Sequence, residues 1–96
     1  MNEPAKSATV CVRCIVAGRV QGVFFRASTR HQAQQLGITG YVTNLLDGRV
    51  EVVACGENTS IDEFRTWLSK GPADARVSGV ACEFIDFREF AQFTVA

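Results

Sequence analysis

The order of the apolar patterns along the chain is the feature that most constrains its fold. Some segments alternate apolar and polar residues at the period of two that is typical of strands, and others space apolar residues as one face of a helix does. The strand-like segments are residues 9–17, 38–43, 50–55, 76–84 and, more briefly, 93–95, and the helical ones are residues 25–36 and 61–68. This order predicts an α+β fold, the ferredoxin-like split βαβ (βαββαβ), with an antiparallel sheet of four to five strands and two helices on one face.

Length and composition favour one globular domain. The 96 residues are 47% hydrophobic and 21% charged, so we expect a flexible segment over residues 1–8 and a single domain over residues 9–96. The formal net charge is zero, and no field draws the chain to nucleic acid or to an anionic membrane. No apolar run approaches the ~20 residues of a membrane span, and the polar start lacks the regions of a signal peptide. We therefore expect a cytoplasmic monomer without membrane or nucleic-acid partners.

The predicted topology decides which loops meet. The first two strands run parallel through a right-handed helical crossover, and the third strand lies between them. The C-terminal ends of the first two strands therefore share one edge of the sheet. We expect the loop at residues 18–22 and Asn44, at the end of the second strand, to lie close together there.

The loop after the first strand carries the pattern of an anion site. Gly18 and Gly22 bracket it, and it leads into the N-terminus of a helix, where backbone N–H groups and the helix dipole favour anions. Such a loop alone is more often an ordinary connection. Arg26 falls in the first helical turn, where a cation opposes the dipole by ~0.3–1 kcal/mol. Arg26 is either a solvated surface residue or a ligand whose guanidinium donates several hydrogen bonds to a phosphate. The loop and the arginine together favour the second interpretation.

Asn44 allows two interpretations. It shares strand parity with Ile38 and Val42, so its side chain should face the helices, where an anion in the loop would lie. However, an asparagine before a turn commonly bonds its own backbone. From the residues alone, turn formation ranks ahead of a role in a site.

Two segments resemble the signatures of a known family. Residues 18–26 read Gly-Arg-Val-Gln-Gly-Val-Phe-Phe-Arg, and residues 40–44 read Gly-Tyr-Val-Thr-Asn, followed by Asp47-Gly48. Both resemble acylphosphatases, and the match covers essentially the whole chain after Ala8. The chain departs from the pattern at its C-terminal end, Val95-Ala96, where the family often carries a basic residue. That departure leaves the predicted site untouched.

The resemblance implies an enzyme that splits the carboxyl–phosphate bond of acyl phosphates without metal or cofactor. The substrates it implies are acyl phosphates such as acetyl phosphate, carbamoyl phosphate and 1,3-bisphosphoglycerate. Arg26 would hold the phosphoryl group and Asn44 would position the attacking water. The loop that would cradle the phosphate with its amides is Gln21, Gly22, Val23, Phe24 and Phe25.

Two alternatives to an independent enzyme remain. One is a ferredoxin-like module that binds a small anion without turnover. The other is a carbamoyl-phosphate-handling domain like those found in larger proteins of hydrogenase maturation. The presence of both Arg26 and Asn44 in the matching motifs favours the enzyme.

The four cysteines do not form a metal or redox motif, and one pair of them could form a disulfide. Cys11 and Cys14 are three residues apart within a strand, which puts them on opposite faces. Cys11 and Cys55 share the face away from the helices, at the meeting ends of neighbouring strands, and could form a disulfide. Unpaired thiols are the alternative in a reducing compartment, and we expect Cys14 and Cys82 to be core thiols. The single histidine, His31, cannot build a zinc cluster.

Overall fold

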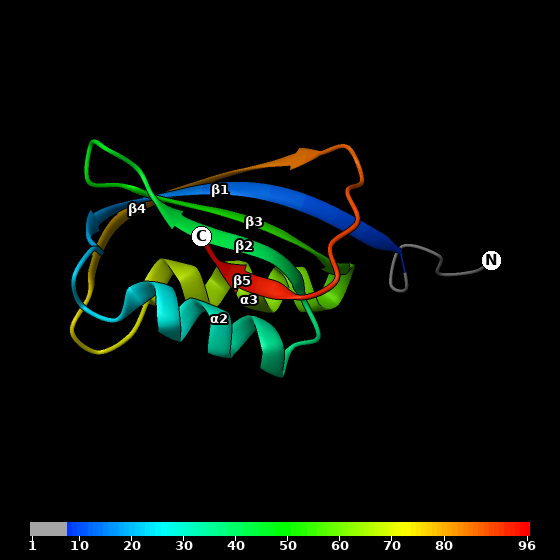
Figure 1. Ribbon diagram of the computed structural model, residues 1–96, viewed down its shortest axis with the longest axis horizontal. Helices are drawn as coiled ribbons and strands as arrows, with labels where there is room; N and C mark the ends of the chain where they lie inside the picture. The colour runs from blue at the N-terminus through cyan, green and yellow to red at the C-terminus, as the bar shows by residue number, and fades with distance from the viewer. Residues whose placement is uncertain (1–7) are drawn as a thin grey trace.

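The computed structural model describes residues 8–96 and places five strands and two helices in the predicted order (Figure 1). Their bounds are β1 (Thr9–Arg19), α2 (Phe25–Gln35), β2 (Thr39–Asn44), β3 (Val50–Glu57), α3 (Asn58–Lys70), β4 (Arg76–Ile85) and β5 (Phe93–Val95). Of the segment expected to be flexible, residues 1–7 lie outside the described part of the chain. No helix among the described residues is long and apolar enough to cross a membrane.

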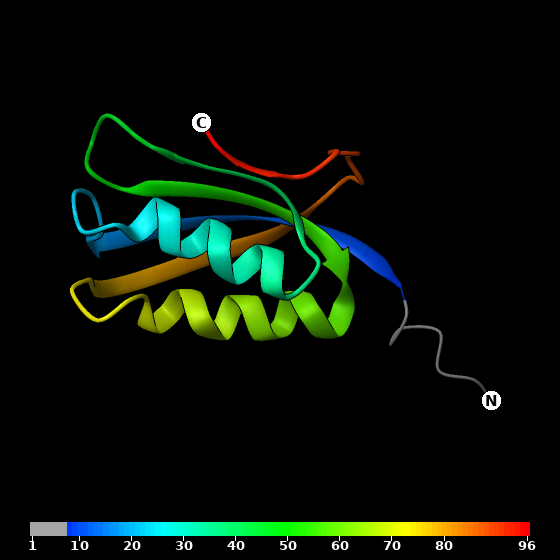
Figure 2. The same ribbon diagram turned by 60° about the horizontal axis from the view of Figure 1, so that its bottom comes forward.

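The sheet has the predicted split βαβ arrangement. Its strand order is β4-β1-β3-β2-β5, and β3 pairs antiparallel with both β1 and β2. The strands β1 and β2 are therefore parallel and separated by one strand. Both helices lie against the same face of the sheet, which the turned view makes plain (Figure 2). The ferredoxin-like α+β prediction is confirmed.

The last strand corrects the prediction of an antiparallel sheet. β5 pairs parallel with β2, so the sheet is mixed. The reason is the connection over residues 86–92, which carries the chain from the β4 edge across the sheet to the β2 edge (Figure 1). After this crossing, the chain enters β5 in the direction of β2. Two backbone hydrogen bonds lie at the ends of the β2–β5 pairing. The Gly40 N–H donates to the Gln92 carbonyl, and the Ala96 N–H donates to the Val42 carbonyl.

The core fixes both ends of the loop between β1 and α2. Val16, Val20 and Phe25 are almost fully buried in the cluster between the sheet and the helices. The Phe25 ring also contacts Trp67 of α3, with 6.1 Å between ring centroids. Residues 20–25 therefore begin and end on buried anchors, and burial of each such side chain stabilises the fold by roughly 1.5–3 kcal/mol. The loop has little freedom to move as a whole.

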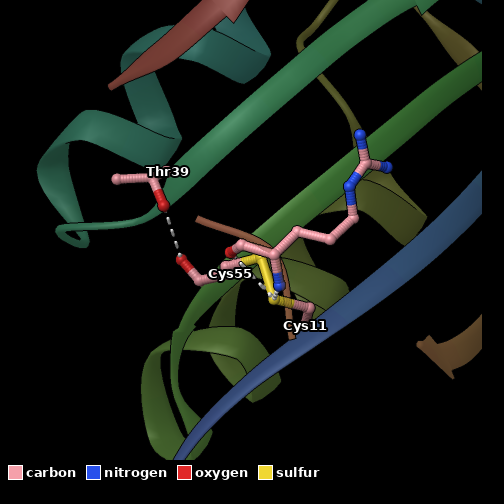
Figure 3. The surroundings of a disulfide bond; sticks show 4 residues. Cys11, Thr39 and Cys55 are labelled. Carbon is pink, nitrogen blue, oxygen red and sulfur yellow. Dashed lines mark hydrogen bonds between the residues drawn. A yellow bond between two sulfur atoms is a disulfide. The ribbon is translucent and has the colours of Figure 1, made fainter. Parts of the chain in front are cut away.

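The cysteines form two disulfides, one on each face of the sheet. Cys11 and Cys55 are directly opposed in the β1–β3 register and are joined on the face away from the helices (Figure 3). The Arg88 N–H, from the crossing connection, lies 3.3 Å from the Cys11 Sγ. The expectation that Cys14 and Cys82 are unpaired core thiols is wrong, because they are directly opposed in β1 and β4 and are also bonded.

Loss of these cross-links should lower the stability of the protein markedly. The bonds span sequence separations of 44 and 68 residues, and loops of this length are each worth about 4 kcal/mol in the chain-entropy model. We expect reductant to shift the urea unfolding midpoint strongly downward. Double replacement of Cys14 and Cys82 by alanine should produce part of that shift.

Peptide mapping decides whether the bonds form. Protein purified without reductant and then treated with an alkylating reagent should yield linked Cys11–Cys55 and Cys14–Cys82 peptides. Because thiols in the cytosol are normally kept reduced, the bonds are expected to form after the protein leaves that compartment. Four alkylated cysteines, with no effect of reductant on unfolding, would reject the disulfides.

Candidate active site

The loop from residue 20 to residue 24 has the backbone geometry of an anion cradle. Gly22 and Phe24 both adopt left-handed conformations, with φ of 74° and 60°. A Cβ built on Gly22 would meet no atom within 4 Å, so backbone conformation and not crowding requires glycine there. Left-handed residues in short loops are typical of backbone nests, in which successive N–H groups converge on an anion.

The helix that follows the loop begins without a side-chain cap from the described residues. Phe24 is the N-cap residue of α2 and makes no side-chain hydrogen bond within residues 8–96, and the first turn contains no acidic residue. The first bond of the helix runs from the Ser28 N–H to the Phe24 carbonyl, at 2.9 Å. The N–H groups before Ser28 thus have no side-chain cap among residues 8–96 and point toward the loop. An anion bound there would satisfy them and interact favourably with the helix dipole.

Arg26 lies beside this cradle. It lines a surface hollow of about 340 Å³ together with Gly22, Phe24 and Val95. The ion pairs within the described part of the chain use Arg13 and Arg49, and none uses Arg26. The guanidinium therefore has no carboxylate partner among residues 8–96, and its donors are available to a phosphate.

Asn44 lies at the same end of the sheet as the loop, where β1 and β2 both end. It is the last residue of β2 and is paired with Val50, which is paired in turn with Val16 of β1. This row of three residues crosses three strands, and Val16 and Val50 are fully buried toward the helices. Since directly paired residues share a face, Asn44 faces the helices, as its parity predicts.

Gln21 connects the loop to the hairpin that follows Asn44. Its Nε2 donates to the carbonyl oxygens of Leu45 and Arg49, at 3.0 Å each. This clamp fixes the spacing between the loop and the end of β2. The sequence predicted a role for the Gln21 amide but not for its side chain. A polar side chain between Val20 and Gly22 was the only signal.

The carboxamide oxygen of Asn44 is buried and has no hydrogen-bond partner in the described part of the chain. Two buried side-chain atoms among residues 8–96 lack a hydrogen bond, Oδ1 of Asn44 and Oγ1 of Thr29. The adjoining turn is capped instead by Asp47, whose Oδ1 accepts from the Arg49 N–H at 3.0 Å. Its Oδ2 accepts from the Arg49 Nε at 2.8 Å. The structure thus does not use Asn44 Oδ1 to cap the turn, and an unpaired buried acceptor of this kind commonly binds a water or a ligand.

Two other kinds of site, a metal site and a histidine site, have less support in the structure. No group of three or more histidine, cysteine, aspartate or glutamate side chains that could hold a metal gathers within residues 8–96. His31 is exposed on α2. The independence from metal thus remains a prediction for experiment.

Comparison with known proteins identifies the family. The acylphosphatase family model matches residues 12–95. A curated acylphosphatase of Legionella pneumophila (strain Paris) is 50% identical over 86 residues, which cover 90% of this chain and 94% of that protein. One from Halorhodospira halophila is 54% identical over 83 residues, covering 86% and 90%. The solved structure of an acylphosphatase from Coxiella burnetii superposes with a TM-score of 0.90 and 45% identity, over 100% of both chains. The chain therefore belongs to the acylphosphatase family.

Proposed function

We propose that this protein hydrolyses the carboxyl–phosphate bond of acyl phosphates, with the phosphoryl group in the loop and a water on Asn44. One observation carries the proposal. Within residues 8–96, an uncapped helix N-terminus and an arginine without a carboxylate partner lie at the same end of the strands as a buried carboxamide oxygen that lacks a hydrogen bond. The first of these suits a phosphoryl group and the second suits a water.

In this proposal the loop and Arg26 bind the phosphoryl oxygens. The amides of residues 21–25 donate from one side and the Arg26 guanidinium from the hollow that it lines. Charge on the phosphoryl oxygens rearranges during transfer, and donors fixed in advance stabilise it without reorganising. The buried anchors Val20 and Phe25 and the clamp from Gln21 provide that fixed geometry.

Asn44 orients the water in this scheme. Its Oδ1 accepts a hydrogen bond from the water and its Nδ2 can donate another. The water oxygen attacks phosphorus, the bond to the carboxyl oxygen breaks, and the carboxylate leaves with the bonding pair. One proton of the water passes to a phosphoryl oxygen, and the other stays on the attacking oxygen, so the products are a carboxylate and inorganic phosphate. Because a carboxylate is a good leaving group, placement and charge stabilisation can supply most of the acceleration.

Phosphate release from acetyl phosphate in the presence of a chelator tests the activity. We expect turnover to be unaffected by the chelator, because Arg26 and the loop amides supply the charge that a metal would otherwise provide. A phosphomonoester such as p-nitrophenyl phosphate should be nearly inert, since its leaving group is poorer. Binding of phosphate without any turnover would support the anion-binding module instead.

The role of metal has its own control. Activity that disappears on chelation and returns with zinc or magnesium would contradict the metal-free mechanism. Metal-free protein with full turnover agrees with it.

As the working form we propose a monomer that acts on small acyl phosphates in the cytoplasm.

A further inference from the structure

Phe24 is an aromatic residue whose side chain lies outside the hydrophobic core. Its side chain is 80% exposed, although it lies between the buried anchors of the loop. It is also the only non-glycine residue with positive φ among residues 8–96. A bulky L-residue in the left-handed region is unfavourable, and glycine or asparagine would adopt it more easily. Neither burial nor backbone preference accounts for phenylalanine at this position.

The exposed ring of Phe24 lies on the rim of the hollow that contains Arg26. Val95, from β5 at the other end of the chain, lines the same hollow and is 37% exposed. Val20 and Ala27 complete an apolar lining around a single cation. Apolar side chains beside one charged group are what a ligand with an anionic head and an apolar body requires.

We infer that Phe24 and Val95 form a subsite for the acyl part of the substrate and that it favours apolar, especially aromatic, acyl groups. This inference rests on the proposed function, because Arg26 must hold the phosphoryl group for the acyl group to reach the rim. With the phosphoryl group against Arg26, the carboxyl carbon projects out of the cradle. An aromatic acyl group can then stack on the exposed ring of Phe24.

A second hollow is the alternative place for the acyl group. It measures about 650 Å³ and lies against Gly22, Val23 and Phe24. Arg19 and Arg76, which are paired in the β1–β4 register, line it. Asp74 also lines it, so one net positive charge remains to attract acyl groups with a second negative charge. The first hollow is favoured for the acyl group because it alone of the two is lined by Arg26.

Substrate preference in variants of Phe24 tests the subsite. The measured quantity is the ratio of kcat/KM for benzoyl phosphate to that for acetyl phosphate. Phe24→Gly adopts the left-handed conformation readily, removes the ring and adds no side chain that could cap the helix N-terminus. We expect the ratio to fall about tenfold. Phe24→Tyr should retain the ratio. Val95→Ser should lower it by a smaller factor.

Two controls separate the subsite from the phosphate cradle. Phe87→Gly removes another exposed phenylalanine, 62% accessible and outside the hollow with Arg26, and should leave the ratio unchanged. Both substrates place the same phosphoryl group in the cradle, so the ratio cancels any effect that a Phe24 variant has on phosphate binding. Inhibition by inorganic phosphate should be unaffected in Val95→Ser and Phe87→Gly. Melting curves of each variant check that the fold is intact.

The outcomes distinguish the subsite from the activity itself. An unchanged ratio in a folded, phosphate-inhibited Phe24→Gly would overturn the subsite and leave the proposed function standing. A preference for succinyl phosphate that is lost in Arg19→Gln would place the acyl group in the second hollow and also overturn it. If the unmutated protein releases no phosphate from any of these acyl phosphates, the proposed function fails and the subsite fails with it.

Discussion

Replacement of Arg26 by glutamine is expected to reduce kcat/KM for acetyl phosphate by about 10³-fold, at the upper end of the scale for one fixed donor. Inhibition by inorganic phosphate should weaken as well. The reason is that Arg26 lines the hollow at the cradle without a carboxylate partner among residues 8–96. Its donors would therefore serve the phosphoryl group in both the ground state and the transition state.

The same substitution should not lower the stability of the protein, although it lowers the activity. Arg26 lies in the first turn of α2, where a positive charge is unfavourable by ~0.3–1 kcal/mol. Glutamine should therefore leave the melting temperature unchanged or raise it slightly while turnover collapses. Arg26→Lys should rescue little activity, because a point charge cannot reproduce the planar fork of donors.

Arg30→Gln is the matched control for Arg26. It removes the same charge one turn further along α2, from an exposed side chain. Phosphate inhibition and kcat should stay close to the unmutated values. If Arg30→Gln is as damaging as Arg26→Gln, or Arg26→Lys is nearly as active as the unmutated protein, the specific role of Arg26 is contradicted and general electrostatic attraction explains the data better.

The sequence was sufficient to predict the arrangement of the sheet around the site. Alternation in β1, β2 and β3 assigns each side chain to a face, because a shift of one residue would move the whole apolar set into water. That assignment placed Asn44 toward the helices and put Cys11 opposite Cys55. Both results depend on strand periodicity and on the order of the elements, which are local properties that the chain displays directly.

Features that depend on register between distant strands were missed. The pairing of Cys14 with Cys82 follows from the alignment of β1 with β4, which shifts at a bulge between Ala17 and Gly18. Nothing in the local pattern predicts where such a bulge falls. The parallel direction of β5 likewise depends on the path of residues 86–92 across the end of the sheet.

The sequence predicts the candidate site as a set of residues but not how the fold holds them in place. The motifs point to the loop, Arg26 and Asn44, and their roles stay predictions. The clamp from the Gln21 side chain to the 45–49 hairpin, by contrast, exists only because β3 spaces the loop and the hairpin correctly. The exposure of Phe24 was also unpredictable, since an apolar residue next to a helix start is more often buried.

Asn44→Ala is the variant that separates positioning of the water from binding of the phosphate. We expect kcat to fall by roughly 10²-fold or more, the scale for a misplaced reacting group. Inhibition by inorganic phosphate should stay near the unmutated value, because the loop and Arg26 are untouched. Stability should change little or rise, since the substitution removes a buried acceptor that has no partner in the structure.

The turn-forming interpretation of Asn44 makes the opposite prediction. If the side chain supports the hairpin, alanine should lower the free energy of unfolding by ~1 kcal/mol and leave kcat almost intact. Asp47→Ala serves as the reference for that behaviour, because Asp47 accepts from the Arg49 N–H in this turn. It should lower the melting temperature and preserve turnover. An Asn44→Ala protein that behaves like Asp47→Ala would return Asn44 to the turn, and one that is stable, phosphate-inhibited and inactive would identify it as the residue that orients the water.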